Sequence, residues 1–140
     1  MAKEIKSEGL EYISHKGKLI CIIVRNSYCN NKVIFFTPQS FSQQLGFLPH
    51  KKGDFIKPHK HKLHKREIFY TQEVLWVKKG KVRVDLYSEE EKFLCSEVLI
   101  KGEIILLCGG GHGVEVLEDS VMIEVKQGPY KGPEDKQFLR

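Results

Sequence analysis

Short apolar runs separated by polar turns follow one another along most of the chain. The runs lie at residues 19–24, 33–36, 74–77, 82–87, 93–95, 98–100, 104–107 and 121–125. They are rich in β-branched and aromatic residues and recur at intervals of about ten residues, which is typical of short strands joined by turns. The pattern predicts an all-β protein, an antiparallel jelly-roll sandwich or barrel, with one short helical turn near residues 40–43.

The strictest alternation of apolar and polar residues falls in residues 82–87. Val82, Val84 and Leu86 alternate there with Arg83, Asp85 and Tyr87. Residues two apart in a strand share a face, so one face of this segment is apolar and the other is polar. The sequence Lys-Lys-Gly-Lys at 78–81 separates it from the apolar run 74–77. We therefore expect a hairpin with its turn at 78–81.

The length of 140 residues predicts a single domain over residues 1–140, with its core at about 15–126. Glycine and proline interrupt residues 127–135, so we expect an irregular C-terminal tail at 127–140. The charged residues 1–6 do not resemble a signal peptide, and no apolar run is long enough to span a bilayer. The four cysteines form no CxxC pair, so we expect free thiols in a reducing compartment and a cytoplasmic protein.

All of the excess positive charge lies in one segment. The chain carries a net charge of +5, and residues 50–66 alone carry +6, from seven Lys or Arg against Asp54. This segment is either a solvated basic loop or a positive rim that attracts a small anionic ligand. It contains neither a recognition helix nor a set of stacking aromatic residues, and this argues against nucleic-acid binding.

The same segment holds most of the histidines. Four of the six lie between His50 and His64, and two of these form the pair His59-Lys60-His61. Phe55-Ile56 predicts the start of a strand through this pair, and on a strand this spacing directs both imidazoles to one face. Neutral imidazole is a common ligand of divalent metals. In a basic stretch, such a pair is also commonly solvated. His112 follows three glycines and begins a further apolar alternation, whereas His15 and His50 are expected in turns or loops.

The spacing of these residues resembles the cupin superfamily. The first cupin motif is similar to the spacing in one stretch of this chain. Five residues separate Gly53 from His59 and one separates His59 from His61; later, six residues separate Glu73 from Gly80. Gly102, five residues and then Cys108-Gly109-Gly110-Gly111-His112 are similar to the second. The resemblance covers residues 53–125 and implies a jelly roll. Residues 123–130 are similar to a small group of bacterial cupins associated with surface-polysaccharide genes.

The resemblance implies a divalent metal held by His59, His61, Glu73 and His112. Eleven residues separate His61 from Glu73, where cupins have three or four, so Glu67 is an alternative carboxylate. The spacing to Gly80 favours Glu73, which makes residues 62–71 an inserted loop. A mixed nitrogen and oxygen set of this kind suits Fe, Mn, Ni, Co, Cu or Zn and does not distinguish among them.

The leading functional hypothesis is a metal-dependent isomerase or epimerase that acts on a small oxygenated anion, such as a sugar acid or sugar phosphate, or a protein that senses such an anion. Glu67, His64 and Tyr70, all in the inserted loop, are the candidate catalytic residues for proton transfer. An iron-dependent dioxygenase and a non-catalytic ligand-binding or regulatory barrel are the alternatives. We also expect a homodimer formed through the apolar strands within residues 19–36, because exposed sheet edges need covering.

Overall fold

The computed structural model describes all of residues 1–140, and these form two compact units. The first unit contains residues 1–29 and 71–140, and the second contains residues 30–70. Every strand pairing is antiparallel, which confirms the all-β class. A short 3₁₀ helix, η1 (Gly132–Asp135), is the single helical element. No helix is long and apolar enough to cross a membrane. The single domain over residues 1–140 stays a prediction.

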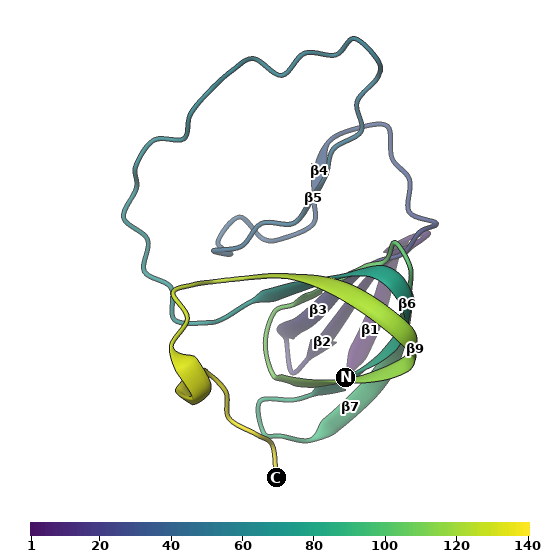
Figure 1. Cartoon of the computed structure of the whole chain (residues 1–140), viewed down its shortest axis with the longest axis vertical. Coiled ribbons are helices and arrows are strands. Elements are labelled where there is room, and N and C mark those ends of the chain that lie inside the picture. The colour runs from purple at the N-terminus through teal and green to yellow at the C-terminus, as the bar shows by residue number, and fades with distance from the viewer. The chain divides into compact units, whose positions relative to one another are not determined.

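The first unit is one antiparallel sheet that curls around its own core (Figure 1). Its strands are β1 (Ala2–Ser7), β2 (Leu10–His15), β3 (Lys18–Val24), β6 (Glu73–Tyr87), β7 (Phe93–Ile100), β8 (Ile104–Leu107) and β9 (Gly111–Lys126). The order in the sheet is β1-β2-β3-β8-β6-β7, and β9 pairs with the other side of β6. This arrangement is a barrel-like or sandwich-like sheet, and the jelly roll in particular stays a prediction.

β6 is one long strand that bends near its middle. Leu75 and Val77 are buried in its first half, whereas Val82 and Leu86 are buried in its second half, so the buried positions change from odd to even numbers. The register with β9 shifts over the same interval, and Gly80 adopts a φ of +87°. The first half pairs with β8 and the second half with β7. The predicted hairpin at 78–81 is therefore wrong, because the chain bends there instead of reversing.

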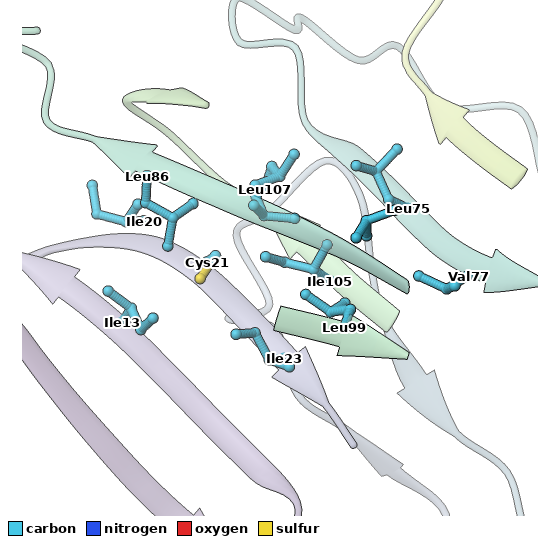
Figure 2. Packing of buried hydrophobic residues seen from close by; sticks show 12 residues of the cluster. Ile13, Ile20, Cys21, Ile23, Leu75, Val77, Leu86, Leu99, Ile105 and Leu107 are labelled. Atoms are coloured by element: carbon cyan, nitrogen blue, oxygen red, sulfur yellow. The ribbon is translucent and has the colours of Figure 1, made fainter. Parts of the chain in front are cut away.

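The core lies inside the curl of the sheet. Figure 2 shows that apolar side chains from β2, β3, β6, β7 and β8 gather between the strands. Each such side chain stabilises the fold by about 1.5–3 kcal/mol relative to leaving it exposed. Cys21, Ile22 and Ile23 on β3 are completely buried, so these three side chains offer no surface to a second copy of the chain. The homodimer itself stays a prediction.

A cluster of charges joins β7 to the opposite end of the sheet. The guanidinium of Arg25, directly after β3, lies 2.9 Å from Glu11 and 2.8 Å from Glu97 on β7. It also lies 3.2 Å from Glu103, and Lys3 on β1 lies 2.7 Å from Glu97. Because no strand pairing joins β7 to β1, β2 or β3, these ion pairs connect the two ends of the curled sheet.

The second unit contains little regular structure. Two short strands, β4 (Ile34–Phe35) and β5 (Gly46–Phe47), pair with each other. The helical turn predicted near 40–43 is not formed, and the backbone N–H of Phe41 instead donates to the Pro38 carbonyl in a tight turn. Residues 48–70 contain neither helix nor strand. The predicted histidine strand is thus wrong. Pro58 lacks an N–H and disfavours a strand there, and His59 Nδ1 lies 2.8 Å from the Lys57 carbonyl oxygen instead.

Candidate functional site

Glu73 and His112, two residues predicted from the sequence, lie together in the first unit. His112 Nε2 is 3.1 Å from Glu73 Oε2. The side chain of Glu73 is 12% exposed and that of His112 is 34% exposed. The pair is thus partly shielded from water, and the open side of the imidazole remains accessible.

The register of the sheet explains why residues so distant in sequence meet. Glu73 begins β6 and pairs with Leu107, while His112 pairs with Leu86. Directly opposed residues in an antiparallel pair project from the same face, and both leucines belong to the core. Glu73 and His112 therefore face the interior of the curled sheet. The short connection between β8 and β9 returns the chain so that His112 lies next to Glu73.

The pair lines a cavity of about 500 Å³ that lies entirely within the first unit. Its walls come from the start of β6, the β6–β7 turn, the β8–β9 loop, both ends of β9 and the C-terminal segment. The lining residues are Thr71, Glu73, Ser88, Glu89, Glu91, Leu107, Gly109, Gly110, Gly111, His112, Lys126, Asp135, Lys136, Gln137, Phe138 and Leu139. Charged side chains and a few apolar side chains line the cavity together.

The neighbours of Glu73 favour its ionised form. The hydrogen bond from His112 lowers the pKa of Glu73; burial opposes this shift, and the positive charges of His112 and Lys126 add to it. Lys126 pairs with Glu73 at the far end of β9, so both ends of that strand contribute to the site. When His112 Nε2 carries its proton, it donates to the Glu73 carboxylate and leaves Nδ1 free to exchange a proton with a ligand.

The glycine run before His112 has a structural role that the sequence did not reveal. Gly110 adopts a φ of +67°, and a Cβ at this position would lie 2.2 Å from the Tyr87 carbonyl oxygen. Its N–H donates to Glu89 Oε1 at 2.9 Å. The loop can therefore lie closely against the end of β6 only with glycine there. Lys126 and Glu89 were missed, because neither residue belongs to a motif with recognisable spacing.

The other predicted site residues belong to the second unit. The His59 and His61 rings contact each other edge to face, with centroids 5.4 Å apart, and both residues are exposed. Glu67 lies 3.5 Å from Lys65, and His64 and Tyr70 are also exposed. No group of three or more His, Cys, Asp or Glu side chains in the structure could hold a metal ion. The four-ligand site and the catalytic roles of Glu67, His64 and Tyr70 stay predictions.

No family model, curated protein or solved structure matches the chain. The cupin resemblance therefore stays a prediction from the sequence motifs.

Proposed function

We propose that the first unit binds a small oxygenated ligand of the sugar class in its cavity and transfers a proton on it, as an isomerase or epimerase does. One observation carries the proposal: the Glu73–His112 pair, with its 3.1 Å contact, lines a cavity of about 500 Å³. A cavity of this volume accommodates a small ligand, and a histidine oriented by a carboxylate is a common arrangement for general acid–base catalysis.

The chemistry follows from the two side chains. His112 takes a proton from the carbon next to the carbonyl group of the ligand, and the electron pair of that C–H bond forms the double bond of an enediolate. The ionised Glu73 stabilises the imidazolium that results. The ammonium of Lys126, which lines the same cavity, stabilises the negative oxygen. Return of the proton from His112 to the neighbouring carbon, with transfer of the hydroxyl proton to the former carbonyl oxygen, completes an isomerisation. Addition of a proton from water to the other face of the same carbon completes an epimerisation.

The side chains that line the cavity bear on the charge of the ligand. The expectation of an anion rested on the basic residues 50–66, which lie in the second unit. The cavity itself is lined by four carboxylates and two lysines. Carboxylates accept hydrogen bonds from sugar hydroxyls, so the lining suits a neutral sugar. The sequence analysis favours a sugar acid or a sugar phosphate instead. The experiment therefore compares a neutral sugar with these two anions.

The experiment is incubation in heavy water with a neutral sugar, its sugar acid and its phosphate, followed by NMR. We expect deuterium at the carbon next to the carbonyl, and about a hundredfold less in Glu73→Gln and His112→Ala. His50→Ala is the matched control, since His50 is paired with Asp54 in the second unit. A ligand that binds without exchange would favour the non-catalytic alternative. Absence of both binding and exchange for all three ligand types would refute the proposal.

The metal ion is a separate proposal that rests on the cupin resemblance. A divalent ion (Fe, Mn, Ni, Co, Cu or Zn) would supply a Lewis acid that polarises the carbonyl group. Two of its predicted ligands, Glu73 and His112, are in contact. No group of three metal-binding side chains is present, and the proposed proton transfer uses only the side chains of Glu73, His112 and Lys126.

Metal content measured across variants tests this second proposal. Loss of a ligand is expected to weaken binding by at least about tenfold in His59→Ala, His61→Ala, Glu73→Gln and His112→Ala. His50→Ala serves as the control, and Glu67→Gln compares the two candidate carboxylates. Equal metal content in the wild type and all of these variants would overturn the metal site and leave the cavity proposal intact.

A further inference from the structure

The end of the chain forms one wall of the cavity. Asp135, the last residue of η1, and residues 136–139 after it line the same cavity as the Glu73–His112 pair. This segment has no strand pairing of its own. It is therefore held against the first unit only by side-chain packing and by a few hydrogen bonds.

Two contacts hold this segment in place. The first is a carboxylate: Glu91 accepts hydrogen bonds from Gln137 Nε2 at 3.4 Å and from the Arg140 N–H at 3.5 Å. Glu91 lies in the β6–β7 turn, which Ser88 fixes by accepting hydrogen bonds from the N–H groups of Glu90 and Lys92 at its hydroxyl. The turn thus presents Glu91 as a fixed docking point for a segment that has few other bonds.

The second contact is apolar and depends on a glycine. A Cβ built on Gly111 would lie 2.8 Å from Leu139 Cδ1, closer than ordinary van der Waals contact. The φ of Gly111 is not in the left-handed region, so its backbone conformation does not demand glycine. A side chain at this position, next to His112 in the sequence, would therefore have to displace the Leu139 side chain.

We propose that residues 135–140 are a lid, which closes the cavity when Leu139 packs on Gly111 and must lift for a ligand to enter. The functional meaning of the lid rests on the proposed function, because it assumes that the ligand binds beside Glu73 and His112. The closed lid covers the part of the cavity next to Gly111 and reduces the contact of this part with water, which strengthens the electrostatic interactions within the site. Segments that are held by few buried contacts open locally without global unfolding, as a lid must.

The test uses the whole ligand-free protein and the reaction of histidines with diethyl pyrocarbonate, followed at each histidine by mass spectrometry. His64, exposed in the second unit, is the internal reference. In Gly111→Ala the added methyl group displaces the Leu139 side chain from the strand, and we expect His112 to react about fivefold faster, which corresponds to the loss of one modest packing contact. Gly113→Ala, on the same strand with open space around its Cβ position, is the matched control and should leave the rate unchanged.

Leu139→Ala removes the other half of the contact and lies away from His112 in sequence, so it separates lid opening from a direct effect on the imidazole. It should also speed the reaction of His112. The double variant Gly111→Ala/Leu139→Ala should react no faster than the faster single variant, because both changes act on one contact. Additive effects, or a His112 rate that neither single variant changes, would overturn the lid. These outcomes are independent of any ligand, so failure of the proposed function is distinguishable from failure of the lid.

Discussion

Gly80 is the residue on which the shape of the first unit depends, and Gly80→Ala should be costly for two separable reasons. Alanine at a φ of +87° pays the left-handed backbone penalty of about 1–2 kcal/mol. In addition, its Cβ would lie 2.4 Å from the Asp119 carbonyl oxygen and 2.2 Å from Ser120 Oγ. The two strands would have to separate at the bend.

That separation removes interactions whose magnitude is known. Ser120 Oγ accepts from the Lys81 N–H at 3.0 Å across the two strands and donates to the Glu118 carbonyl oxygen at 2.6 Å within its own strand. The cross-strand hydrogen bond is worth about 1 kcal/mol. Together with the backbone penalty, the free energy of unfolding should therefore fall by about 2–3 kcal/mol in Gly80→Ala. Because the bend brings both ends of β9 to Glu73, the variant should also lose binding in the cavity.

Gly17→Ala is the matched control for the backbone penalty. Gly17 has a φ of +76° and nothing within 4 Å of its Cβ position, so only about 1–2 kcal/mol should be lost. Urea unfolding followed by the fluorescence of Trp76, the one tryptophan in the chain, measures both variants. The midpoint of Gly80→Ala should lie about 0.5 M below that of Gly17→Ala. Equal midpoints would refute the close packing of Gly80 against β9.

Three further predictions concern charges and thiols. Arg25→Met leaves three partly buried carboxylates without their common partner and should lower the free energy of unfolding by about 2–4 kcal/mol in the same urea assay. Burial raises the pKa of Cys108 to about 12, so at about pH 8 iodoacetamide should label exposed Cys29 and leave Cys108 unlabelled until the protein unfolds, as peptide mass spectrometry would show. The hydrogen bond from His112 holds the pKa of Glu73 below 4.5 in the folded state. The stability from Glu73 is thus present above about pH 4.5 and lost as the pH falls, so metal-free Glu73→Gln should show a flatter pH dependence in acid.

Local patterns in the sequence determined the class of the fold and several strands. The alternation of Val82, Val84 and Leu86 with polar residues is confirmed in β6, and all three side chains are buried. The apolar run at 104–107 is β8. Such predictions succeed because the side-chain period of a strand is a property of neighbouring residues, and it appears in the sequence whatever the strand pairs with.

Two other local signals were ambiguous, and only the tertiary structure decided between their outcomes. A glycine in a polar segment marks either a reversal or a bend. At Gly80 the pairing of β6 with β8 and then with β7 selects the bend. The pair His59 and His61 shares a face only if the segment is a strand, and a strand needs a partner for its hydrogen bonds. Residues 48–70 have none in the structure, so the spacing of the two histidines does not determine their geometry. β1 shows the opposite case: it is exposed throughout and has no apolar signature, and it is a strand because β2 pairs with it.

For the candidate site as well, the sequence determined some features and the tertiary structure decided the others. Its most informative residues, Glu73 and His112, were named from sequence spacing, and each begins or nearly begins a strand as predicted. Their contact depends on the bend in β6 and on the closeness of the β8–β9 loop to the core. The involvement of Lys126 and of the C-terminal segment depends on the curl that brings the end of β9 back to Glu73. Contacts between distant residues are set by sheet register and chain closure, and these are properties of the whole fold that no short stretch of sequence encodes.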